Sequence, residues 1–164
     1  MNNFVELLEY HVWANKRILS QVSDLAQERF VQEKNDCLTM MRQALLHLLK
    51  TDWIWLDFWK GQAIMDYPPS WDKFTFDDIE KVWESMQLNM LEELKSILPT
   101  REDNDIEFSN GDEQTHILKF YQTVNLVINH GTYYRGQIAS IIETLAIDPV
   151  KTQLFDYYTR RVHV

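Results

Sequence analysis

The run LTMMRQALLHLLKTDWIWLDFWK, residues 38–60, contains neither Gly nor Pro. At about 100° per residue, its polar side chains form one narrow stripe, and the rest of the helical surface is apolar. The stripe consists of Thr39, Arg42, Gln43, Lys50 and Asp57. A helix with this pattern is buried over most of its circumference, so other elements must pack around it. Gly61 and Pro68–Pro69 follow the run and predict that the helix ends near Lys60.

Three other long segments have the same helical period. The first covers about residues 4–22, the second begins at Thr75 and ends at Pro99, and the third covers about 117–145. The Thr75 hydroxyl can cap the amide of Asp78. Four long amphipathic helices predict an all-α four-helix bundle, in which ligand sites are built from inward-facing side chains. We expect a single domain over residues 1–164.

A moderately long connection separates the third and fourth predicted helices. Residues 101–116 are polar and acidic, and Asn110–Gly111 is a turn signal within them. This pattern is compatible with a short hairpin or with an irregular loop. Residues 154–158, LFDYY, are rich in aromatic side chains and are compatible with a short final helix.

Charge and cysteine content limit the classes of partner. The chain has 164 residues and a formal net charge of −9, with only four Gly and four Pro. The negative charge argues against binding nucleic acid or an anionic membrane surface, and the few Gly and Pro argue against an all-β fold. Cys37 is the only cysteine and cannot form an internal disulfide. With no signal-peptide start and no apolar run of membrane-spanning length, the sequence predicts a cytoplasmic protein.

Several hydrogen-bonding side chains fall on apolar helix faces. His130 and Tyr134 are four residues apart and therefore lie on one surface of the last long helix, and His11 and Asn15 repeat this spacing in the first. An inward imidazole can be a metal ligand, but a hydrogen-bonded core histidine is the more frequent case for one residue taken alone.

Two polar residues of the second long helix do not have a clear place in its helical pattern. His47 lies at the edge of the polar stripe, so periodicity alone does not select it. Asp52 falls among apolar side chains, and a buried carboxylate needs a partner or a metal. A salt bridge to another helix is the alternative.

Three stretches resemble a known family. They are YHVWAN at 10–15, LHLL at 46–49 with Asp52 and Trp55–Leu56, and NHGTYYRGQI at 129–138. Over about residues 4–158 the chain resembles the DinB/YfiT-like family of metalloenzymes, whose members carry an Asn-His-x-x-Tyr-His-Arg-Gly-Gln-like stretch in the last long helix. The resemblance implies a four-helix bundle, commonly a homodimer, that holds a divalent metal with three histidines.

The match to the metal ligands is incomplete. By position, the resemblance assigns His47 and His130 as ligands, but the third position holds Tyr134. Imidazole binds Zn²⁺, Ni²⁺ or Fe²⁺ well at neutral pH, whereas a phenol with a pKa of about 10 must first lose a proton. Either Tyr134 binds as a phenolate, or His11 substitutes for it, or the metal is bound weakly or not at all. If the metal is bound weakly or not at all, a pocket remains, and we expect His11, Asn15 and Asp52 to belong to it.

The resemblance implies a metal-dependent hydrolase or a thiol transferase. The partners of such an enzyme are a small-molecule substrate or thiol and a second copy of the chain. The resemblance assigns no catalytic residue beyond the metal ligands. The alternative is a non-catalytic bundle of the bacterial stress response that binds a small molecule and has a degenerate metal site. The family's association with DNA damage does not indicate DNA binding here, because the net charge is −9.

Overall fold

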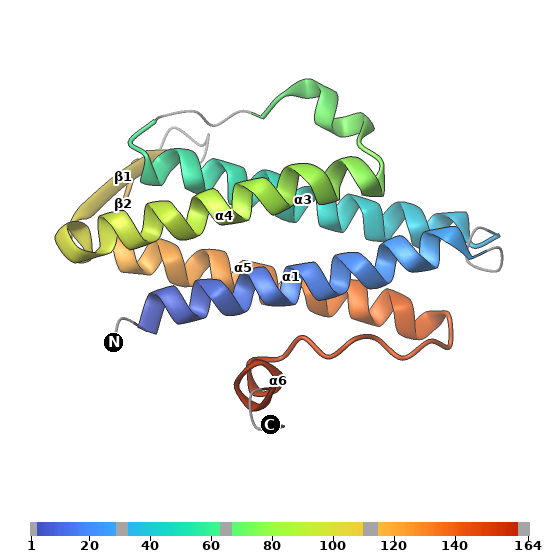
Figure 1. Cartoon of the computed structure of the whole chain (residues 1–164). Coiled ribbons are helices and arrows are strands. Elements are labelled where there is room, and N and C mark those ends of the chain that lie inside the picture. Colours follow the sequence, from blue (N-terminus) through green and yellow to red (C-terminus); the bar gives the residue numbers. More distant parts are fainter. Residues whose placement is uncertain (1–2, 29–32, 63–66, 110–114, 161–164) are drawn as a thin grey trace.

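The computed structural model describes residues 3–28, 33–62, 67–109 and 115–160. Its four long helices are α1 (Asn3–Gln27), α3 (Asn35–Trp59), α4 (Phe76–Arg101) and α5 (Phe120–Thr144). They form one elongated bundle, so the all-α architecture expected from the sequence is confirmed (Figure 1). Helices α1 and α3 each pack against both α4 and α5.

Helix α3 is the heavily buried helix that the sequence predicts. Its buried apolar side chains include Met41, Leu45, Leu48, Leu49, Leu56 and Trp59. It begins three residues before Leu38, at Asn35, and ends at Trp59 beside Gly61, whose φ is +75°. This left-handed conformation is the one that glycine adopts most readily after a helix.

Helix α4 begins where predicted but ends later. Thr75 accepts a hydrogen bond from the amide of Asp78, and the Asp78 carboxylate accepts one from the amide of Thr75. These two bonds form a capping box. The predicted end at Pro99 is wrong, because the helix continues to Arg101. A proline in the last turn removes only one backbone hydrogen bond, so the turn can continue past it.

The connection between α4 and α5 is a hairpin. Strand β1 (Asp105–Ser109) pairs antiparallel with β2 (Thr115–Lys119), and the Asn110–Gly111 turn signal lies outside the described residues. Helix α5 therefore begins at Phe120 and not near Ile117. Residues 117–119 instead pair with residues 105–107 in the hairpin.

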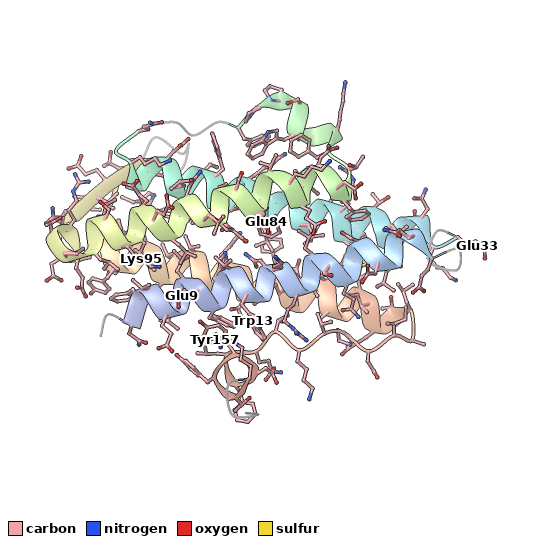
Figure 2. All side chains as sticks on the ribbon, viewed as in Figure 1. Glu9, Trp13, Glu33, Glu84, Lys95 and Tyr157 are labelled. Carbon is pink, nitrogen blue, oxygen red and sulfur yellow. The ribbon has the colours of Figure 1, made fainter. Side chains whose placement is uncertain are left out.

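Two short helices cover the outside of the bundle. The 3₁₀ helix η1 (Pro69–Lys73) lies against α3 and buries Trp71. Helix α6 (Leu154–Thr159) confirms the short final helix and places Tyr157 edge-on against Trp13 of α1, as Figure 2 shows. None of the helices within the described residues combines the length and hydropathy of a membrane span.

Surface ion pairs join α1 to α4 on the face that Figure 2 presents. Lys95 approaches Glu9 at 3.7 Å, and Lys16 approaches Glu84 at 3.2 Å. Both pairs are well exposed, so each contributes little to stability. The face that they mark lies away from the α3–α5 contact, on which the candidate metal ligands lie.

Candidate metal centre

The contact between α3 and α5 brings His47 and His130 together. Their Nε2 atoms are 3.0 Å apart. Tyr134 lies one turn beyond His130, and the centroid of its ring is 4.4 Å from that of His47 and 4.7 Å from that of His130. The three residues that the family resemblance assigns to the metal thus form one cluster.

The separation of the two nitrogens fits a shared ion. Imidazole nitrogens bind first-row divalent metals at about 2.1 Å, so two neighbouring ligands of one ion lie about 3.0–3.4 Å apart. A hydrogen bond between two neutral imidazoles accounts for the same distance. With a shared metal ion or with a hydrogen bond, the two Nε2 atoms lie close together, and at least one of them carries no proton.

Both imidazoles are held in the neutral form, which is the form that binds metal. Partial burial of the His47 ring, and then the charge of Lys50, lower the His47 pKa. Burial also lowers the His130 pKa, and His47 and His11 add to this effect while Asp52 opposes it. His47 is exposed at its outer edge, and His130 and Tyr134 are half-buried. Each ring therefore has one nitrogen without a proton at neutral pH.

Two hollows flank this cluster and adjoin at Thr51, which lines both of them. The Thr51 hydroxyl donates to the backbone oxygen of His47 and lies 3.4 Å from His130 Nε2. The hollow on the His47 side has a volume of about 420 Å³ and polar walls; they include Arg42, Lys50, Tyr67 and Asp72. The hollow on the His130 side has a volume of about 570 Å³, and its walls are more apolar; they include Trp55, Leu126 and Tyr133.

His11 and Asp52 belong to a separate, fully buried network. His11 Nε2 lies 3.1 Å from Asp52 Oδ2, and the same oxygen accepts a hydrogen bond from Trp83 Nε1 at 2.8 Å. His11 Nδ1 faces Arg135 Nη1 at 3.5 Å. Asn15 Nδ2 also lies 2.8 Å from His11 Nε2, so a hydrogen-bond acceptor and a hydrogen-bond donor both face this nitrogen. Asp52 thus lies within hydrogen-bonding distance of side chains on two other helices, His11 of α1 and Trp83 of α4.

Arg135 is the cation of this network, and it is not among the residues that the sequence predicts for the site. Its guanidinium donates to Asn15 Oδ1 at 2.7 Å, to Thr132 Oγ1 at 3.0 Å and to the Tyr10 hydroxyl at 3.2 Å. A signal was present in the sequence, because Arg135 lies four residues after Gly131 on the buried face of α5. Arg135 and Asp52 are opposite charges that compensate each other inside the bundle.

Gly131 makes room for this network. A Cβ atom at position 131 would lie 2.4 Å from His11 Cε1 and 2.7 Å from Arg135 Nη1. Both distances are far below van der Waals contact. The glycine in the 129–138 stretch therefore allows α1 to place its imidazole directly against α5.

The predicted site residues thus divide into two groups. His47, His130 and Tyr134 form the open cluster, whereas His11, Asn15 and Asp52 are buried and line neither of the hollows beside it. Both ring nitrogens of His11 face other partners, so His11 is not placed to replace Tyr134. Among the described residues, no three His, Cys, Asp or Glu side chains form a metal-binding group. Tyr134, whose ring packs against both imidazoles, is the third residue of the cluster.

The sequence is similar to those of known proteins over most of its length. A sequence model of the DinB family matches residues 1–160. Protein DinB of Bacillus subtilis (strain 168) is 26% identical over 156 residues, and the match covers 87% of this chain and 86% of that protein. The chain is thus similar to members of this family over nearly its full length.

Proposed function

This chain belongs to the DinB family, and from that premise we propose that it is a metal-dependent enzyme with a divalent ion between α3 and α5. The observation that carries the proposal is the 3.0 Å separation of His47 Nε2 and His130 Nε2 across the helix contact. Two neutral imidazoles at this spacing are suitable ligands for Zn²⁺, Ni²⁺ or Fe²⁺.

Tyr134 is the third ligand in this proposal. Its ring packs against both imidazoles, and an adjacent cation favours the phenolate form of a tyrosine. A divalent ion held by three protein groups lowers the pKa of a coordinated water or thiol and polarises an electrophile. The residues of the chain hold and orient the reactants around it.

The two hollows favour thiol transfer over hydrolysis. A transferase must hold a thiol and an electrophile at once, and the cluster has a separate hollow on each side. A hydrolase needs space for one substrate and water. We therefore propose a small-molecule thiol and a small electrophilic substrate as reactants, in a cytoplasmic protein that pairs with a second copy of itself.

A second function has one observation in its favour. Tyr134 stands where the family resemblance implies a histidine, and a phenol is the weaker ligand at neutral pH. The alternative is a non-catalytic bundle that binds a small molecule in the same hollows, in the manner of a stress-response protein. It requires no stoichiometric metal.

Turnover in the presence and absence of metal separates the two functions. The thiol probe is N-acetylcysteine and the electrophile is 1-chloro-2,4-dinitrobenzene, with 4-nitrophenyl acetate as the hydrolase probe. We expect conjugation that needs added Zn²⁺, Ni²⁺ or Fe²⁺, stops with EDTA and is lost in His130→Gln. Conjugation and hydrolysis at the uncatalysed rate, together with no metal uptake, would favour the non-catalytic bundle.

A further inference from the structure

Lys50 places a positive charge in the wall of the His47-side hollow. It follows His47 by three residues on α3, so the two side chains lie on adjacent parts of one helix face. The Lys50 side chain is only 15% exposed. Burial by itself lowers the Lys50 pKa, but contacts with Asp72 and Tyr67 outweigh burial and raise it above its ordinary value. The ammonium is therefore charged at every physiological pH.

The partner of this ammonium can be replaced by another carboxylate. Lys50 Nζ lies 2.5 Å from Asp72 Oδ1 and 3.8 Å above the centre of the Tyr67 ring. The Asp72 side chain belongs to the short helix η1 and is 62% exposed. An enclosed cation thus faces an exposed anion at the rim of a hollow. Rotation of Asp72 into water leaves the ammonium open to a ligand without moving the bundle.

A second cation fixes the position of η1. Arg42 Nη1 donates to the backbone oxygens of Asp72 at 3.3 Å and of Phe74 at 3.0 Å. The described walls of this hollow therefore contain two cations and one carboxylate, in a chain with a net charge of −9. Such a local excess of positive charge attracts anions from solution.

We propose that Lys50 binds the carboxylate of a small acidic substrate, and that Asp72 occupies this position when the substrate is absent. The inference rests on the proposed function, because it names the substrate class that enters the hollow beside His47. The apolar walls of the other hollow, which include Trp55 and Leu126, offer no such cation. The acidic substrate and the electrophile accordingly enter from different sides of the cluster.

Matched acid and amide probes test the proposal on ¹⁵N-labelled protein by NMR titration. One pair is N-acetylcysteine and its amide, and the other is N-acetylalanine and its amide, which lacks the thiol. In wild type we expect both acids to bind about tenfold more tightly than their amides, because a carboxylate adds a charge–charge attraction to the hydrogen bond with Lys50 and a neutral amide does not. The largest shifts should fall at residues 47–51.

Three variants should affect the preference for acid over amide in three different ways. Lys50→Met should abolish the preference for acid over amide, whereas Asp72→Asn should strengthen acid binding by removing the competing carboxylate. Lys119→Met is the matched control, because Lys119 pairs with Asp105 on the hairpin, and it should leave the preference unchanged. A native amide spectrum of each variant establishes that it is folded.

The titrations are run on EDTA-treated and on Zn²⁺-loaded protein. The acid preference is expected in both, because Lys50 acts through its own charge. Equal affinity for acid and amide, or a preference that survives Lys50→Met, would overturn the inference. A preference that persists in a protein that takes up no Zn²⁺ would contradict the metal proposal alone.

Discussion

His47 and His130 are 83 residues apart in the chain, yet their Nε2 atoms lie 3.0 Å apart where α3 packs against α5. This juxtaposition depends on the tertiary packing of two helices. Neither helix shows it by itself. Tyr134 completes the cluster one turn further along α5. The chemistry that the cluster supports depends on what Tyr134 contributes.

Replacing Tyr134 by histidine should raise Zn²⁺ affinity at pH 7 by at least about tenfold, because imidazole needs no deprotonation of a group with a pKa of about 10. Isothermal titration calorimetry measures the change. Tyr134→Phe is the matched control and should weaken binding if the phenolate is a ligand. Unchanged affinity in Tyr134→His would show that position 134 does not face the ion.

Gly131→Ala should destabilise the fold by about 1–3 kcal/mol, the usual cost of overpacking a core. The added Cβ would lie 2.4 Å from His11 Cε1, and His11 is fully buried. The control is Gly136→Ala in the same helix, where a Cβ meets nothing within 4 Å. The free energy of unfolding of Gly136→Ala should rise by up to about 1 kcal/mol, because alanine has a higher helix propensity than glycine. Urea unfolding of the two variants should therefore give opposite signs, and equal signs would refute the packing argument.

The effects of removing the buried charges of Asp52 and Arg135 on the free energy of unfolding should depend on one another. Asp52→Asn or Arg135→Met alone leaves one charge inside the bundle without compensation, at a cost of about 3–5 kcal/mol. The double variant buries no charge, so its loss should be smaller than the sum of the two by at least about 1 kcal/mol. Denaturant unfolding of all four proteins measures this coupling. Strict additivity would show that the two charges do not interact.

Asp57→Asn should stabilise the protein at neutral pH, because it removes a buried negative charge whose desolvation raises the Asp57 pKa. Asp57 is 5% exposed, its Oδ2 has no hydrogen-bond partner, and burial raises its pKa above 3.8 although Lys60 opposes this. The folded state therefore holds the carboxyl proton more tightly than the unfolded state does.

The sign of the pH dependence follows from that difference. The contribution of Asp57 to the free energy of unfolding falls as pH rises from about 3.8 to the raised pKa of the folded state. Asp57→Asn should remove this fall, whereas Asp24→Asn at an exposed position should not. Thermal unfolding between pH 4 and pH 7 compares them. Parallel curves for wild type and Asp57→Asn would contradict the assignment.

The sequence predicts the helices well because their apolar periodicity is strong, and its errors are local. Pro99 does not end α4, and residues 117–119 pair in a strand although they continue the helical period. At residues 117–119 the pairing with β1 outweighs the helical period, whereas at Pro99 a proline in the last turn removes only one backbone hydrogen bond. The hairpin was one of two alternatives, since its pairing depends on contacts across a turn.

Part of the candidate site is likewise predictable from the sequence, and part is not. His130, Tyr134 and His11 follow from the position of each on an apolar face, but His47 is exposed and was selected only by the family resemblance. Arg135 is not among the predicted site residues, although its spacing of four residues from Gly131 places it on the buried face of α5. The Lys50–Asp72 contact joins α3 to η1, and such a contact depends on how a loop folds back.

Metal stoichiometry is measured on protein purified without a histidine tag, by mass spectrometry after dialysis against Zn²⁺ or Ni²⁺. We expect one ion per chain, lost in His47→Gln and in His130→Gln and retained in His116→Gln on the hairpin. Substoichiometric metal in wild type, or an ion that remains in both cluster variants, would contradict a metal centre between α3 and α5.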